Sequence, residues 1–284
     1  MSLQPDSAML DAPTRAFYQR AMRLLQERQL EFLVGGAYSF ARYTGIERHT
    51  KDFDIFVRPQ DAPAILQSLS EAGYETELTF PHWLGKAFNG EAFIDVIYSS
   101  GNGVARVDDV WFQHSVADYV LDIPVRLCPA EETIWSKAFV MERERYDGAD
   151  VAHLLRATGR TLGWRRLIAR FDAHWRVLLA HVVMFGFIYP GERSAIPAWV
   201  VEHLSARLRA ESRTAQPAAE VCQGTLCSRA QYLVDVEHWG YHDARLAPAG
   251  NMSQGEIDRW TAAIGSDPAT LPGQPGLQPA AATG

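Results

Sequence analysis

The sequence contains little cysteine, no apolar run long enough to cross a bilayer and no excess of positive charge. Its three cysteines in 284 residues are too few for a disulfide scaffold and are typical of a compartment where thiols stay reduced. The most apolar run, residues 177–189, is shorter than the roughly 20 residues that a membrane-spanning helix needs, and His181 interrupts it. This run predicts a buried core helix. The N-terminus has no basic segment followed by an apolar one, so we expect a cytoplasmic protein with no membrane partner.

Acidic residues outnumber basic ones, 34 against 27, which gives a formal charge of −7. This balance argues against a protein that grips nucleic acid over its whole surface, so any site for a polyanion must be local. With 47% hydrophobic and 21% charged residues, the composition is that of an ordinary globular protein. The length is sufficient for one large domain or two modest ones.

The ends of the chain differ in composition from the rest. Residues 1–12 and the Pro-, Gly- and Ala-rich residues 263–284 hold too few apolar side chains to offset the entropy of ordering, which predicts a flexible N-terminus and a disordered tail. Between them, residues 13–128 show alternating strand and helix patterns. Pro129 and the two glutamates shortly after it favour a helix start, and helical spacing follows. Residues 129–262 are therefore predicted to form a mainly helical domain.

The first of these domains has the periodicity of an α+β fold. Helical spacing covers residues 13–29, 37–43 and 63–72, and strand patterns cover residues 31–34, 52–57, 74–78, 84–88 and 93–98. This order predicts a small mixed β-sheet with flanking helices, followed by the helical half. Residues 218–262 are rich in Trp, Tyr and His but have no clear period, so their fold stays open.

Three aspartates lie where strands are expected. Asp52 and Asp54 are two residues apart on one strand, so both side chains leave the same face, with α-carbons about 6.6 Å apart. Asp95 is alone in an apolar run, where an isolated acid is costly unless it is paired or bound to a metal. Converging carboxylates suit Mg²⁺, and two such ions about 3.5–4 Å apart are what displacement at phosphorus requires. A turn or a solvated strand face is the alternative interpretation of the Asp52 and Asp54 pair.

Gly35 and Gly36 follow the first predicted strand and precede a helix. Glycines at such a turn let backbone amides approach a phosphate at the helix N-terminus. A simple tight turn is the alternative. The two glycines become more informative when they are read together with the three aspartates.

The order of hydrophobic strand, Gly-Gly, Asp-x-Asp and a later lone Asp resembles the nucleotidyltransferase superfamily, which DNA polymerase β typifies. The run from Arg48 to Asp54 is similar to that of the small antibiotic nucleotidyltransferases and of the nucleotidyltransferase toxins of abortive-infection systems. The resemblance covers mainly residues 31–98. It implies that residues 13–128 form a nucleotidyltransferase-like α/β catalytic domain. The spacer from Gly-Gly to Asp-x-Asp, residues 37–51, is longer than the commonest form.

The resemblance also implies roles for individual residues. Asp52 and Asp54 would hold two Mg²⁺ ions, or Mn²⁺ in their place, together with the nucleoside triphosphate. Asp95 would ligate the catalytic metal and orient or deprotonate the acceptor hydroxyl. Ala37 stands where a Ser or Thr often holds phosphate in the family, so Ser39 would take that role. The residues expected to bind the nucleotide are Gly35, Gly36, Ser39, Arg48, Lys51 and Lys137.

Three supporting features each have a simpler interpretation. Lys137 sits on the same helical side as Ile134 and Met141, which suits a phosphate contact and equally a lysine that extends from a core helix. Asp147 is expected to cap the helix that follows it. The arginines of residues 156–176 are expected on a solvated helix face, and the functional alternative is that they steer a triphosphate or an RNA end.

These features predict a Mg²⁺-dependent, ATP-binding enzyme that moves a nucleoside monophosphate from a nucleoside triphosphate to an acceptor hydroxyl and releases pyrophosphate. The acceptor stays open among a small molecule, a protein side chain and an RNA end. One alternative is a nucleotide- or partner-binding module that keeps the fold without turnover, such as a component of a toxin–antitoxin pair. Another is a phosphohydrolase that uses the same carboxylates on water.

Overall fold

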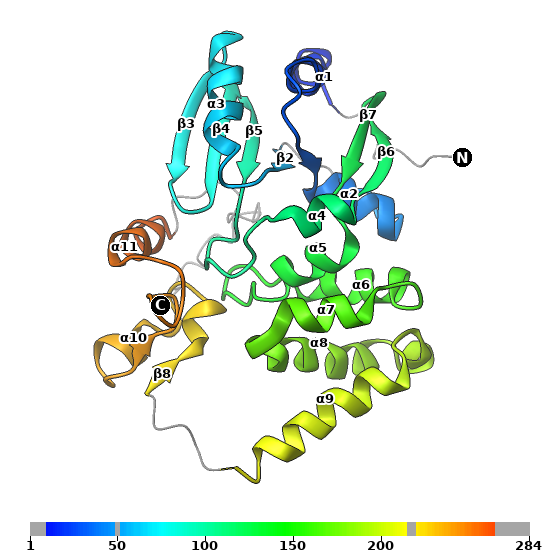
Figure 1. Cartoon of the computed structure of the whole chain (residues 1–284), viewed down its shortest axis with the longest axis vertical. Helices are drawn as coiled ribbons and strands as arrows, with labels where there is room; N and C mark the ends of the chain where they lie inside the picture. The colour runs from blue at the N-terminus through cyan, green and yellow to red at the C-terminus, as the bar shows by residue number, and fades with distance from the viewer. Residues whose placement is uncertain (1–9, 49–51, 215–219, 265–284) are drawn as a thin grey trace, which may run out of the picture.

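A seven-stranded mixed sheet organises the first half of the chain in the computed structural model, which describes residues 10–48, 52–214 and 220–264. Helices flank the sheet and a helical half follows, so the predicted α+β class is confirmed. The strand order is β3-β4-β5-β2-β1-β7-β6 (Figure 1). The strands are β1 (Leu33–Val34), β2 (Asp52–Phe56), β3 (Glu75–Phe80), β4 (Leu84–Asn89), β5 (Ala92–Ile97), β6 (Val116–Val120) and β7 (Ile123–Leu127).

The middle of the sheet has one buried face and one face that carries acids. The helices beside the sheet are α1 (Ala12–Glu27), α2 (Gly36–Thr44), α3 (Ala62–Glu71) and α4 (Asp109–Gln113). Phe53 and Ile55 of β2 share one hydrophobic cluster with residues of α1 and α3, and Tyr18 of α1 stacks on Phe53 at 4.8 Å between ring centroids. Because side chains alternate along a strand, Asp52 and Asp54 leave the opposite face. The buried face therefore fixes the orientation of the acids.

The hairpin of β6 and β7 is not among the predicted strands. Its two turn residues, Leu121 and Asp122, have φ angles of 51° and 64°. Such turns usually carry Asn-Gly or Asp-Gly, because glycine adopts positive φ without strain. Leu121 gives no such signal in the sequence. Its side chain instead lies in the core beneath the sheet, which stabilises the conformation.

Stacked helices form the second half of the molecule, beside one end of the sheet (Figure 1). They are α5 (Ala130–Lys137), α6 (Gly148–Thr158), α7 (Trp164–Phe171), α8 (Trp175–Ile188) and α9 (Ala198–Glu211), with short 3₁₀ helices at Asp172–His174 and Pro190–Ala195. The core helix predicted at residues 177–189 is α8, and Leu178, Val182 and Phe185 fill the helical core. The opposite side of α8 is exposed, and Phe187 keeps 79% of its surface.

One stretch among the described residues, Trp164–Ile188, is long and apolar enough to cross a membrane when only length and composition are considered. In this fold it comprises α7, a 3₁₀ turn and α8, and it supplies core residues of the helical half. The cytoplasmic location stays a prediction.

The segment that the sequence left open returns to the sheet. It contains β8 (Val221–Cys222), a 3₁₀ turn (Gln223–Leu226), α10 (Leu233–Glu237), β9 (His242–Asp243) and α11 (Gln254–Ala262). Figure 1 shows α11 below the ends of β3 and β4, and the guanidinium groups of Arg229 and Arg245 lie 5.4 and 5.9 Å from the Trp260 ring of α11. The domain division at residue 128 stays a prediction. The ends predicted to be flexible, residues 1–12 and 263–284, lie almost entirely outside the described residues.

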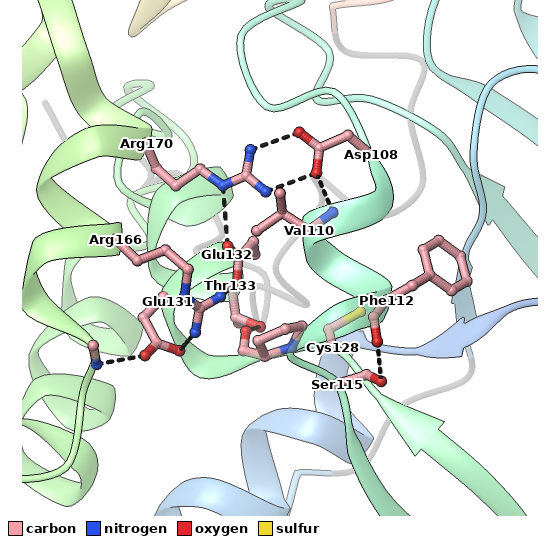
Figure 2. Close-up of polar contacts among 12 residues, drawn as sticks. Asp108, Val110, Phe112, Ser115, Cys128, Glu131, Glu132, Thr133, Arg166 and Arg170 are labelled. Atoms are coloured by element: carbon pink, nitrogen blue, oxygen red, sulfur yellow. Dashed lines mark hydrogen bonds and ion pairs between the residues drawn. The ribbon is translucent and has the colours of Figure 1, made fainter.

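A buried network of ion pairs joins α5, α7 and the loop before α4 (Figure 2). Glu132 on α5 is completely buried and accepts hydrogen bonds from Arg166, at 2.5 Å, and Arg170, at 3.0 Å, both on α7. Arg170 makes two further bonds, of 2.6 and 2.7 Å, to Asp108. Arg166 lies 2.7 Å from Glu131. The expectation of a solvated basic face is therefore wrong for Arg166 and Arg170, because buried carboxylates pair with both.

Candidate active site

Three carboxylates gather on one face at the centre of the sheet. In the parallel pair of β2 and β5, Asp54 lies directly opposite Asp95, so their side chains leave the same face side by side. Asp52 precedes Asp54 by two residues and leaves that face as well. The fold thus brings together the three acids that the sequence singled out.

The crowding of these acids changes the protonation of Asp54. Burial raises the pKa of its carboxyl from 3.8 to about 7, and the charges of Asp95 and Asp52 contribute in the same direction. Lys137 and Arg145 lower this pKa, which places both cations near the carboxylates. Near neutral pH the metal-free site therefore holds Asp54 partly protonated. A bound divalent cation would offset the repulsion among the acids.

The glycine turn packs directly against Asp54. Gly35 caps α2, and its N–H donates to the backbone carbonyl of Asp54 at 3.0 Å. Gly36, the first residue of α2, has a φ of +54°, and a Cβ added there would lie 1.7 Å from Asp54 Oδ2. Only glycine fits this position without a shift of the carboxylate. The positive end of α2 thus lies next to the acids, an arrangement that favours anions.

We expect Gly36→Ala to lower nucleotide-dependent activity by about a hundredfold, because the new methyl group must displace the Asp54 carboxylate. Gly45→Ala is the matched control. Gly45 ends the same helix with a φ of +70° and has no atom within 4 Å of an added Cβ, so it carries the backbone strain without the clash. Both variants should lose roughly 1 kcal/mol of stability from strain. Equal loss of activity in the two would show that the contact with Asp54 is unimportant.

A chain of ion pairs joins the helical half to Arg48, which lies between α2 and β2. Lys137, at the end of α5, lies 2.9 Å from both Asp147 and Asp150. Arg48 lies 2.5 Å from Asp150, and Arg145 lies 3.1 Å from Asp147. Burial alone would raise the pKa of each aspartate, but the Lys137 ammonium and the arginines hold both below the usual value. This cluster holds Lys137, which lies near Asp54, and connects it through Asp150 to Arg48.

The remaining predictions have mixed outcomes. Asp147 does occupy the position before α6, but its side chain makes no capping bond and pairs with Lys137, so the capping role is wrong. The ammonium of Lys137 reaches carboxylates instead of only emerging from an apolar stripe. Ser39 is fully buried, and its hydroxyl donates to the Gly36 carbonyl at 3.3 Å. Lys51 lies outside the described residues. The nucleotide-binding roles of Ser39, Arg48, Lys51 and Lys137 stay predictions.

The chemistry of the donors suits a Mg²⁺ ion that arrives with its ligand. Within the described part of the chain, no three His, Cys, Asp or Glu side chains are arranged to hold a metal ion by themselves. Mg²⁺ is commonly held by only one or two carboxylates together with phosphate oxygens and water. Asp52 and Asp54 offer such a pair, next to a helix N-terminus suited to phosphate.

Comparison with known proteins bears on this geometry. Residues 19–97 match the family model of the aminoglycoside-2''-adenylyltransferases. The predicted nucleotidyltransferase resemblance is confirmed. The matched segment holds β1 to β5, the glycine turn and all three acids of the candidate site. No curated protein sequence matches the chain.

Three solved structures of nucleotidyltransferases are similar to the fold at low sequence identity. The solution structure of the antibiotic-resistance factor ANT(2'')-Ia has 17% identity and a TM-score of 0.42, and the match covers 61% of this chain and 98% of that one. The lincosamide antibiotic adenylyltransferase LnuA, bound to lincomycin, has 15% identity and a TM-score of 0.35, with 49% and 94% covered. ANT(2'')-Ia in complex with adenylyl-2''-tobramycin has 13% identity and a TM-score of 0.36, with 71% and 99% covered.

The nucleotidyltransferase-like segment also contains a residue that the sequence analysis missed. Lys86 of β4 lies opposite Asp95, and its Nζ is 2.7 Å from Asp95 Oδ1. An available signal was Gly90 followed by Glu91 between the two predicted strands, because a two-residue hairpin turn can carry glycine at its first position. A two-residue turn after Asn89 pairs that residue with Ala92, and counting back along the hairpin pairs Lys86 with Asp95. Arg145 and Asp150 had no such signal, because their contacts depend on how the helical half packs.

We expect Lys137→Ala to weaken binding of MgATP to the nucleotidyltransferase-like site by about tenfold or more, since the ammonium lies near the acids and next to the expected phosphates. The change also leaves Asp147 and Asp150 without one cation, which should cost about 1–3 kcal/mol of stability. Lys137→Arg keeps the charge and should retain most of both properties. Calorimetric titration and thermal melts measure the two effects. Unchanged affinity beside a large loss of stability would assign Lys137 a structural role only.

Proposed function

We propose that this protein is a Mg²⁺-dependent nucleotidyltransferase. In the reaction, an acceptor hydroxyl attacks the α-phosphorus of a nucleoside triphosphate. The new oxygen–phosphorus bond forms as the bond to pyrophosphate breaks, and the hydroxyl proton passes to a base. The observation that carries the proposal is the register of Asp54 and Asp95 on β2 and β5, with Gly36 of α2 packed against Asp54.

The position of each residue suggests its role in the transfer reaction. Backbone N–H groups at the N-terminus of α2, beside Gly35 and Gly36, would donate hydrogen bonds to phosphate oxygens. Lys137 and Arg48 would balance triphosphate charge from the other side of the site. Asp52 and Asp54 would hold Mg²⁺, which neutralises phosphate charge when bound. Asp95 would orient the acceptor hydroxyl and take its proton.

The matched family favours ATP as the donor and a small hydroxyl-bearing molecule as the acceptor. Its model is named for adenylyl transfer to a 2''-hydroxyl and matches the segment that holds the three acids. The net charge of −7 agrees with an acceptor that is not a long nucleic acid. A protein side chain and an RNA end remain acceptors for the experiment to distinguish.

The test is product analysis with ATP labelled at either the α- or the γ-phosphate. We expect the α label to move to an acceptor and the γ label to leave as pyrophosphate, in a reaction that needs Mg²⁺. Candidate acceptors are a panel of aminoglycosides and lincosamides, a tRNA pool and the protein itself. Binding of intact ATP without transfer would support the non-catalytic module, including a toxin–antitoxin component. Free AMP without a labelled acceptor would indicate a phosphohydrolase.

A further inference from the structure

A lysine is built into the sheet beside the candidate base. Lys86 and Asp95 are paired residues on the antiparallel strands β4 and β5, and 2.7 Å separate Nζ from Oδ1. Both side chains are largely shielded from solvent, with 19% and 15% of their surface exposed. The ammonium also lies 4.0 Å from the centre of the Phe93 ring, a cation–π contact on the same face of the sheet. This pair is therefore held by backbone register and by packing.

The scarcity of lysine sets this position apart. The chain has three lysines and 24 arginines. Lys86 contacts Asp95, Lys137 lies near Asp54, and the third lysine directly precedes Asp52 in the sequence. Elsewhere the chain uses arginine for its cations. Lysine differs from arginine in presenting a compact point charge, which resembles a small metal cation more than the planar guanidinium does.

Asp95 needs a cation because of its neighbour. Asp54 lies directly opposite it on β2, and two carboxylates side by side repel each other. The row across three strands runs Asp54, Asp95 and Lys86, so the ammonium approaches Asp95 from the side away from Asp54. Lys86 thus supplies positive charge where Asp95 would otherwise require a second metal ion.

We propose that Lys86 is a positioning residue that acts at Asp95 in place of a second metal ion, so that Mg²⁺ is held by Asp52 and Asp54 alone. This proposal rests on the proposed function and differs from the two-ion scheme that the family resemblance implies. The ammonium fixes one oxygen of Asp95, and this orients the carboxylate toward the acceptor hydroxyl. Asp52 and Asp54 bind the nucleotide through Mg²⁺, whereas Asp95, positioned by Lys86, orients the acceptor hydroxyl.

The kinetic test compares Lys86→Met with Lys137→Met. Methionine keeps an unbranched stem against Phe93 and removes only the charge. We expect Lys86→Met to lower kcat by about tenfold or more while the KM for MgATP stays within about threefold, and Lys137→Met to raise that KM instead. Lys86→Arg should restore part of kcat. Wild-type kcat in Lys86→Met, or a loss of MgATP binding equal to that of Lys137→Met, would overturn the proposal.

A binding test does not depend on turnover. Equilibrium dialysis with Mn²⁺ and a non-hydrolysable ATP analogue should find a single Mn²⁺ per chain in the wild type and a second in Lys86→Met, because Asp95 then accepts a metal. A second Mn²⁺ already present in the wild type, or no gain in the variant, contradicts the proposal. If no acceptor is ever labelled but the Mn²⁺ count changes as expected, the proposed function fails and the pairing role of Lys86 stands. Lys86→Gln replaces Lys86→Met if melts show the latter to be unfolded.

Discussion

Asp54→Asn is expected to abolish nucleotide transfer, by about a thousandfold or more, and yet to stabilise the metal-free protein. The loss follows because Asp54 is both a proposed Mg²⁺ ligand and the carboxylate against which the glycine turn packs. The stabilisation follows because burial and the charges of Asp95 and Asp52 make an ionised Asp54 unfavourable. The substitution should therefore lower activity and raise stability.

The sign of the pH dependence follows from the raised pKa. Burial and the neighbouring acids raise the pKa of Asp54 from 3.8 to about 7, so in this interval the folded protein holds the proton more tightly than the unfolded chain does. The contribution of Asp54 to the free energy of unfolding is thus present at pH 4 and is lost as the pH rises through 7. Asn cannot ionise, so the free energy of unfolding of Asp54→Asn should exceed that of the wild type by about 1–3 kcal/mol at pH 8. This difference is smaller than the pKa shift alone implies, because solvent screens the charge of a half-buried group.

Thermal melts at pH 5 and pH 8, with and without Mg²⁺ and a non-hydrolysable ATP analogue, measure both effects. The stability advantage of Asp54→Asn should appear at pH 8 and shrink at pH 5. Mg²⁺ with the analogue should raise the melting temperature of the wild type but not that of Asp54→Asn. Asp258→Asn, a change on the exposed part of α11, is the matched control and should respond as the wild type does. A variant less stable than the wild type at pH 8 would mean that Asp54 is a paired structural acid.

Glu132→Ala is expected to cause the largest loss of stability, about 3–5 kcal/mol, because it leaves Arg166 and Arg170 in the core without their shared carboxylate. Glu132 has no exposed surface and accepts one hydrogen bond from each of these arginines. The network also holds α5, which carries Lys137 at its end. The variant should therefore bind MgATP more weakly as well.

Chemical denaturation gives the free energy of unfolding for this comparison. Glu202→Ala on the exposed side of α9 serves as the control, and we expect a change there within about 0.5 kcal/mol. Glu132→Gln tests the cause, because its amide oxygen can still accept a hydrogen bond from one arginine, so it should lose less stability than Glu132→Ala. A loss below about 1 kcal/mol for Glu132→Ala would show that solvent or local rearrangement satisfies the two arginines.

Local patterns were sufficient to predict the part of the site that lies on neighbouring strands. Alternating apolar residues placed Asp52 and Asp54 on one strand face, and the glycine pair marked the turn before α2, because both signals come from a few adjacent residues. The contacts of Asp150 with Lys137 and Arg48 depend on the packing of α6 against α5 and α2. No short stretch of sequence contains that information.

Contacts between residues distant in sequence also explain why the predictions for Arg166, Arg170 and Asp147 were wrong. Arg166 and Arg170 have the spacing of a surface face, yet the buried Glu132 of another helix determines where their side chains lie. Asp147 stands where a helix cap belongs, but a charge-assisted pair with Lys137 competes with the capping bond. In both cases a long-range ion pair outweighs a local preference.

The central claim is that Asp52 and Asp54 form a Mg²⁺-dependent nucleotide site. Calorimetric titration of a non-hydrolysable ATP analogue into the wild type and Asp54→Asn, with Mg²⁺ and with EDTA, tests it most directly. We expect one-to-one binding that needs both Mg²⁺ and Asp54, with no measurable heat in either the EDTA or the Asp54→Asn titration. Equal affinity with EDTA, or an unchanged affinity in Asp54→Asn, would contradict the claim.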